Sequence, residues 1–195
     1  PLLVALICGF WTTQAIAVAA RLGVADLLQR DPQTVDALAT AVQADPSSLH
    51  RLLRALGSVG LCAEEDGRWH LTPAGDALRS DAEGSLRAFA MMMGAPETWN
   101  AWAELGHSVR TGESAFERVF GEPLFEYFAR HPQAARLFDA ALAGRGVYED
   151  RAIVAAYPLR RTRRSSTSAA AAVHCWSRSS SGSRTPTACC STCRT

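Results

Sequence analysis

The residues best suited to chemistry in this 195-residue chain are methionines and aromatic residues between positions 91 and 120. Aromatic side chains offer large flat faces, and methionine adapts to irregular surfaces. Such a group suits a pocket for a flat aromatic ligand, although ordinary core packing uses the same residue types. Three successive methionines on one helix cannot all face the same way, so part of the group must belong to the core. The residues that could line such a pocket are Met91, Met92, Met93, Trp99, Trp102, Phe116 and Phe120.

Side chains that could move protons or hold a metal are few. His107 and His131 are candidate bases, but the sequence places no carboxylate–histidine pair or nucleophile motif near them, so we assign no catalytic residue. Four cysteines follow residue 159, near His174, with a spacing that matches no usual zinc pattern, so we expect no metal. Only Cys8 and Cys62 precede them, a sparse use that suits the reducing cytoplasm.

The segment 159–195 differs in composition from the rest of the chain. It has seven Arg and no Asp or Glu. The residues before it carry thirteen Arg and nineteen acidic residues, which gives them a net charge of −6, whereas the whole chain has a net charge of +1. The chain has no Lys and much Ala, as expected of a GC-rich gene. We back-translated residues 165–177 with codons that end in G or C and translated the result in the reading frame that starts one nucleotide earlier. This frame gives V-V-D-V-G-G-G-x-G-A-L-L-V. The same shift, with a T-ending codon at Cys190, turns residues 188–195 into V-L-F-D-L-P-H.

The two shifted strings have the layout of a nucleotide-binding unit. An apolar strand runs into a glycine-rich turn, and a second apolar strand about 20 residues later ends in an acid. Glycines let the backbone approach a ligand closely, and the acid can bind ribose hydroxyls. We therefore interpret 159–195 as the product of a frameshift. The resulting tail lacks an apolar period, and we expect it to be disordered and non-native.

Hydrophobic periodicity before residue 159 predicts a mainly α fold. A first helix should cover residues 2–29, interrupted near Gly9 and Gly23. Its apolar opening is shorter than a membrane span and has no basic leader, so we expect no membrane contact. Because the sequence begins without Met, we expect it to be a fragment. Later helices should start at Thr72-Pro73 and near Ser85, and two more should cover residues 124–129 and 132–143, with the helical pattern ending near Tyr157-Pro158.

Between these regions the order helix, turn, helix, hairpin predicts a winged helix-turn-helix. Thr34 and Asp45 are expected N-caps, and Glu65-Asp66-Gly67 is the expected hairpin turn. The second helix carries His50, Arg51 and Arg54, which in a winged-helix transcriptional regulator would contact DNA. The net charge of −6 opposes that alternative, because DNA binding needs a concentrated positive surface.

Several runs resemble one known family, the bacterial S-adenosylmethionine-dependent O-methyltransferases related to caffeic acid and acetylserotonin O-methyltransferases. The first runs are GFWTTQA at residues 9–15 and AARLGVAD at residues 19–26. The winged segment matches through LHRLLRAL at 49–56, VGL at 59–61 and LTPAG at 71–75, and the later part through WAEL at 102–105, Phe116, FG at 120–121 and FEY at 125–127. The resemblance covers residues 2–158.

The resemblance implies that residues 1–84 form a winged-helix dimerisation domain and residues 85–158 a helical lid or linker over a small-molecule acceptor. It implies a homodimer, with Phe10 and Trp11 at the interface. The residues that we map to the acceptor pocket are Met92, Met93, Trp99, Trp102, Phe116 and Phe120. Because of the net charge of −6, we expect no nucleic-acid partner. In that family an α/β Rossmann-like domain, which binds S-adenosylmethionine, follows this region. In this chain the frameshifted tail follows it instead. We therefore expect no cofactor-binding residue, no bound S-adenosylmethionine and no activity in this chain.

Overall fold

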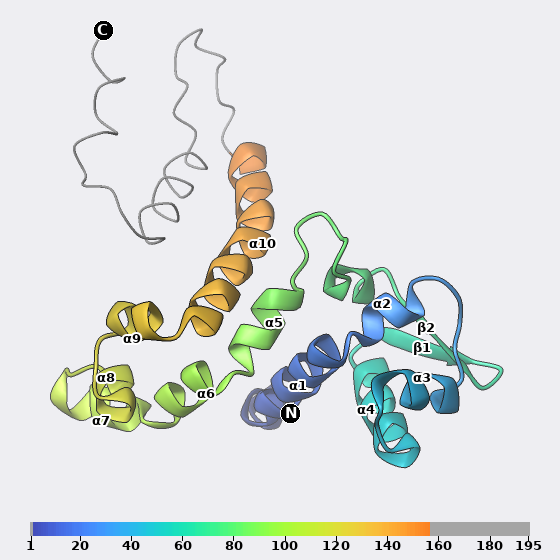
Figure 1. Ribbon diagram of the computed structural model, residues 1–195, viewed down its shortest axis with the longest axis horizontal. Coiled ribbons are helices and arrows are strands. Elements are labelled where there is room, and N and C mark those ends of the chain that lie inside the picture. Colours follow the sequence, from blue (N-terminus) through green and yellow to red (C-terminus); the bar gives the residue numbers. More distant parts are fainter. Residues whose placement is uncertain (1, 157–195) are drawn as a thin grey trace, which may run out of the picture. The chain divides into compact units, whose positions relative to one another are not determined.

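The computed structural model describes residues 2–156 (Figure 1). The frameshift and tail predictions for 159–195 lie outside the described residues. The described part is mainly helical with one small sheet, which confirms the predicted fold class. In chain order its elements are α1 (Leu2–Leu22), α2 (Val24–Leu28), α3 (Val35–Val42), α4 (Pro46–Ser58), β1 (Cys62–Glu65), β2 (Arg68–Leu71), the 3-10 helix η1 (Gly75–Leu78), α5 (Arg87–Met93), α6 (Pro96–Ala103), α7 (Leu105–Thr111), α8 (Ala115–Phe120), α9 (Leu124–Arg130) and α10 (Pro132–Ala156).

The first predicted helix breaks at one of its two glycines. Gly23 adopts a φ of 70°, a left-handed conformation that glycine tolerates, and it separates α1 from α2. The predicted interruption at Gly9 is wrong, because α1 runs through that position without a break. A single glycine costs a helix only about 1 kcal/mol relative to alanine, which is too little to end it.

The winged unit has the predicted order and caps. The Thr34 hydroxyl accepts the Ala37 N–H at the start of α3, and the Asp45 carboxylate accepts the Ser48 N–H at 2.7 Å at the start of α4. Strands β1 and β2 pair antiparallel, with Cys62 opposite Leu71. Asp66 and Gly67, at φ of 50° and 72°, make the turn between them.

The wing is tied back to the chain before α3. Gln33 and Trp69 exchange two backbone hydrogen bonds, at 2.9 and 2.7 Å. The predicted helix after Thr72-Pro73 is only the short 3-10 helix η1. The Thr72 hydroxyl accepts the Gly75 N–H, so a side-chain turn replaces the first turn of an α-helix.

The hydrophobic core of the described residues lies between α1, α2, α3, α4 and the hairpin. Its members include Leu28, Leu38, Leu49, Leu56 and Trp69 around Leu53. Leu53 has an exposed fraction of 0%, whereas Leu52 on the same helix is half-buried at the edge. The apolar side of α4 therefore anchors the winged unit.

We expect Leu53→Ala to lower the free energy of unfolding by about 2–5 kcal/mol, because it leaves a cavity at the core centre. Leu52→Ala is the matched control and should cost clearly less. Urea denaturation at one fixed protein concentration measures both, since dimerisation would otherwise shift the midpoints. Equal losses from the two variants would contradict this account of the core.

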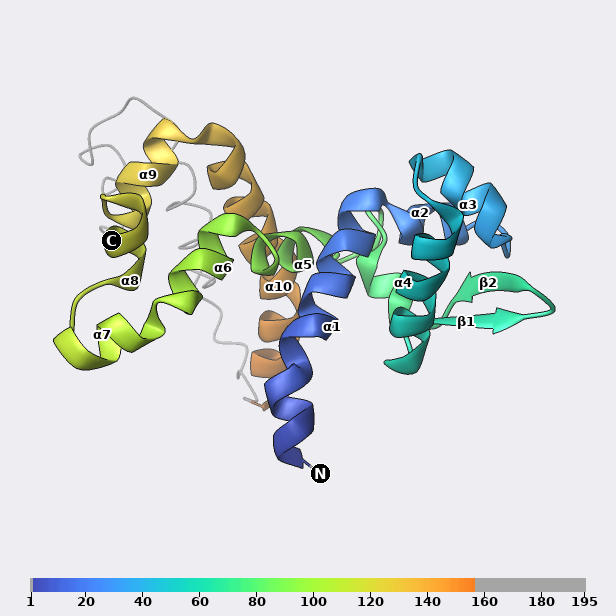
Figure 2. The ribbon, with the colours of Figure 1, turned by 90° about the horizontal axis from the view of Figure 1, so that it is seen from below.

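The helices after the wing pack onto α1 through α5, which lies beside it in Figures 1 and 2. The last helix, α10, extends to Ala156, beyond the predicted end at residue 143. At Gly144 this helix approaches the backbone carbonyl of Ser85 so closely that any Cβ would collide with it. Glycine is required there by close packing, and its low helix propensity is not enough to end α10.

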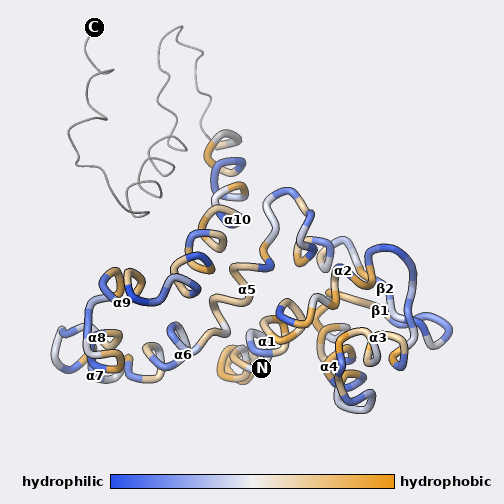
Figure 3. The backbone as a smooth tube through the Cα atoms, viewed as in Figure 1, coloured by the Kyte–Doolittle hydropathy of each residue, from blue (hydrophilic) through white to orange (hydrophobic). Residues whose placement is uncertain are grey.

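The amino-terminal half of α1 is apolar and exposed. Leu2, Leu3, Leu6 and Ile7 are each exposed by more than 60%, and the hydropathy colouring of Figure 3 is strongly apolar along this helix. By length and composition α1 could cross a membrane, a test that a core helix of a soluble protein also passes. Its other half, with Ala17, Ala19 and Ala20 buried, packs inside the protein.

Candidate acceptor site

A cavity of about 500 Å³ lies among α5, α6, α8, α9 and α10. Most of its lining is apolar, and its volume is within the usual range for small-molecule sites. The lining side chains are aromatic, aliphatic or methionine, except for three polar ones: Glu97, Thr98 and Arg145. Such a cavity can take a flat, mostly apolar ring system.

Four of the six residues that the sequence predicts for acceptor binding line this cavity: Met92, Met93, Trp102 and Phe116. The other two are not among its lining residues. Trp99 instead lies 6.3 Å from the Phe10 ring, which links α6 to α1. The structure thus brings together the greater part of a group spread over residues 92–120, and the role of each residue in binding stays a prediction.

Phe120 packs against Phe116, one of the residues that line the cavity. Its ring centroid lies 4.5 Å from that of Phe116 and 5.0 Å from that of Tyr127. Tyr127 also stacks on His131, with centroids 3.8 Å apart. These aromatic contacts fix Tyr127 and Phe116 in place. They give His131 a packing role at the end of α9.

Sequence reasoning missed other residues of the lining. Among them are Phe89 on α5, Phe128 on α9, and Leu137, Phe138 and Leu142 on α10. In the sequence of α10, the helical spacing of apolar residues indicated that the helix has a buried face. Which other helix each face would meet was not visible in the sequence.

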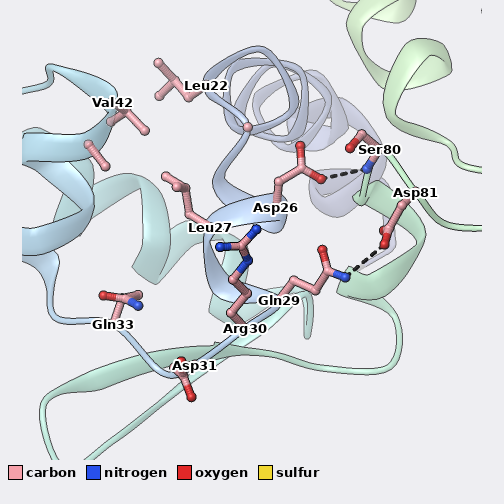
Figure 4. Close-up of a pocket in the computed structure, with 12 residues that line it drawn as sticks. Leu22, Asp26, Leu27, Gln29, Arg30, Asp31, Gln33, Val42, Ser80 and Asp81 are labelled. Carbon is pink, nitrogen blue, oxygen red and sulfur yellow. Dashed lines mark hydrogen bonds between the residues drawn. The ribbon is translucent and has the colours of Figure 1, made fainter.

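A larger hollow of about 700 Å³ lies beside α2 and α3 and has a mixed polar and apolar lining (Figure 4). Two of its acids, Asp26 and Asp81, are already engaged: Asp26 accepts the Ser80 N–H at 2.7 Å and pairs with Arg87 at 2.6 Å. The Gln29 amide donates to Asp81 at 2.9 Å. Hydrogen bonds from Arg79, and then from Gln29, hold the pKa of Asp81 below its usual value. These groups connect the loop after η1 to α2, so the smaller apolar cavity is the better ligand site.

The structure corrects one prediction about the histidines. His107 Nε2 lies 3.1 Å from the Glu113 carboxylate, a carboxylate–histidine pair that the sequence did not reveal. Gly112, which ends α7 in a left-handed conformation, turns the chain so that Glu113 can reach back. Glu113 is largely exposed and neither residue lines the cavity, so the pair gives no reason to assign a catalytic role.

The remaining reactive groups do not form a site. Burial raises the pKa of the Cys62 thiol to about 11, so it stays protonated at neutral pH. No group of three or more possible metal ligands occurs in the described part of the chain. On α4, the Arg51 guanidinium donates to the Ser47 and Ser48 hydroxyls of its own helix, an arrangement that suits a solvated surface.

Comparison with known proteins finds a match in the amino-terminal region. Residues 4–81 match the model of the O-methyltransferase dimerisation domain. The matched residues include most of α1, the winged unit and η1.

The similarity extends beyond that domain. Phenazine O-methyltransferase PhzM of Lysobacter antibioticus is 42% identical over 157 residues, covering 80% of this chain and 46% of that protein. The crystal structure of LaPhzM superposes with a TM-score of 0.75 at 42% identity, covering 80% of this chain and 47% of that one. Human N-acetylserotonin methyltransferase, solved in complex with SAM, gives a TM-score of 0.71 at 27% identity, with coverage of 81% and 48%. The chain thus spans about half the length of these relatives.

Proposed function

We propose that this chain is the dimerisation and acceptor-binding region of an S-adenosylmethionine-dependent O-methyltransferase that acts on small aromatic molecules. The observation that carries the proposal is the apolar cavity, which is built from the helices that follow a methyltransferase dimerisation domain. Phenazine, named in the relative with 42% identity, is a flat aromatic molecule of the kind such a cavity suits. Met92, Met93, Trp102 and Phe116 are the residues proposed to contact the acceptor.

We also propose that the protein works as a cytoplasmic homodimer. The amino-terminal half of α1 exposes an apolar surface that includes Phe10 and Trp11, and the matched dimerisation domain begins at residue 4. A helix that is apolar all round needs a covering surface. In a homodimer, α1 of a second copy would cover this apolar surface, so that no membrane is needed to cover it.

The described residues do not fit the cofactor. Neither strand among residues 2–156 leads into a glycine-rich turn and a helix, the arrangement that binds the cofactor in nucleotide-binding βαβ units. S-Adenosylmethionine supplies the transferred methyl group in the family. The part of the reaction proposed for these residues is therefore to hold the acceptor and exclude water from it. We propose that the 195-residue chain itself binds no S-adenosylmethionine and has no activity.

Binding of a hydroxyphenazine to the purified chain tests the acceptor role, with tryptophan fluorescence as the signal because Trp102 lines the cavity. Ala101→Phe, which fills the cavity, should weaken binding by about tenfold or more, since the ligand loses its apolar contacts. Ala103→Phe on the same helix lies outside the lining and is the matched control. The proposal fails if the two variants bind the hydroxyphenazine equally well.

A further inference from the structure

The cavity has two ionisable residues in its lining, Glu97 on α6 and Arg145 on α10. Arg145 is already paired. Its Nε donates to the Glu149 carboxylate at 2.7 Å, and its guanidinium lies over the Phe89 ring, 5.5 Å from the centroid. Because Glu149 neutralises it within the same helix, Arg145 is poorly placed to recognise an anionic ligand.

Glu97 is in the opposite situation. Within residues 2–156 its carboxylate has no cationic partner, and its one hydrogen bond comes from the Tyr127 hydroxyl, which donates to Oε1 at 3.3 Å. The second oxygen, Oε2, keeps its capacity to accept a hydrogen bond. The first turn of α6, where Glu97 lies, favours a negative charge through the helix dipole.

The partner of Glu97 is held firmly. The Tyr127 ring lies 5.5 Å from Phe116 on one helix and stacks on His131. Burial, and then the nearby Glu97 charge, raise the pKa of Tyr127, so its hydroxyl remains a donor at neutral pH. A half-buried carboxylate that one donor holds in the lining of an apolar cavity is an acceptor-only group.

We propose that Glu97 is the specificity-determining residue of this cavity, accepting at Oε2 a hydrogen bond from a phenolic hydroxyl or an aromatic N–H of the ligand. The inference rests on the proposed function and adds to it the residue that would recognise the donor group of the aromatic ligand. Ligands of the same shape without a donor leave the carboxylate unsatisfied and bind less tightly. Tyr127 is a positioning residue that holds Glu97.

The test compares 2-naphthol with 2-methoxynaphthalene, which has a similar ring system and no donor, by titration of the full 195-residue chain. The wild-type chain should prefer 2-naphthol by about tenfold or more, the discrimination expected of a charge-assisted hydrogen bond. Glu97→Leu should reduce the preference to about twofold or less while 2-methoxynaphthalene binds at least as well as before. Tyr127→Phe should reduce the preference in part.

Glu104→Leu is the matched control, because Glu104 pairs with Arg118 at 3.2 Å and is not in the lining. It should leave the preference unchanged, and circular dichroism shows whether each variant keeps its fold. If both naphthalenes bind the wild-type chain equally, or Glu97→Leu keeps the preference, the role of Glu97 is overturned and the acceptor cavity stands. If neither naphthalene binds, the proposed acceptor function is overturned together with it.

Discussion

Trp11→Glu is expected to dissociate the homodimer, raising its dissociation constant by at least about 100-fold. Trp11 is 62% exposed in the single chain and lies beside Phe10, with ring centroids 5.5 Å apart, on the apolar half of α1. In a dimer built on this half, the substitution removes a large aromatic contact and buries a charge without a partner. Tryptophans at interface centres commonly contribute 2 kcal/mol or more, and the buried charge adds to that loss.

Sedimentation equilibrium at micromolar concentration measures the effect. Val109→Glu is the matched control: Val109 is 78% exposed on α7, outside the matched dimerisation domain, and its replacement should leave the dimer intact. Trp11 is a cleaner probe than Phe10, because Phe10 also contacts Trp99 within the chain. A Trp11→Glu chain that remains fully dimeric would overturn the interface. A wild-type chain that is monomeric and binds lipid vesicles would favour the membrane alternative for α1.

Correction of the reading frame is expected to have an all-or-none effect on cofactor binding. The 195-residue chain should show no heat of binding with S-adenosylhomocysteine. A gene read one nucleotide earlier from the codons of residues 157–168 should yield a protein that binds it at micromolar concentration. The physical reason is that glycines in the shifted string allow close approach of the backbone, whereas residues 169–173 in this chain are four alanines and a valine.

A frame-corrected variant with valine in place of the first glycine of the turn is the control and should lose binding. Two results would refute the frameshift: methylation by the purified 195-residue chain, or codons for residues 165–177 that give no glycine turn in the earlier frame. Resequencing the gene across residues 157–168 is the simplest check.

Local chemistry in the sequence was sufficient for much of the fold. Thr34 and Asp45 cap α3 and α4 because a short polar side chain before an apolar helical pattern satisfies free backbone N–H groups. Asp66-Gly67 between two short apolar runs gave the hairpin for the same local reason. The end of α10 was predicted too early, and Gly9 was predicted as a break, since tertiary packing can carry a helix through weak helix formers.

The sequence by itself determined the winged unit, the apolar character of α1 and the methionine and aromatic group from which the cavity is drawn. These follow from spacing along one helix or one turn. Only the tertiary structure decided that Trp99 contacts Phe10, that Phe128, Phe138 and Leu142 complete the cavity, and that Tyr127 donates to Glu97. Such contacts join helices that are far apart in the chain. Periodicity shows which face of a helix is buried, but the partner of that face depends on how all the helices pack together.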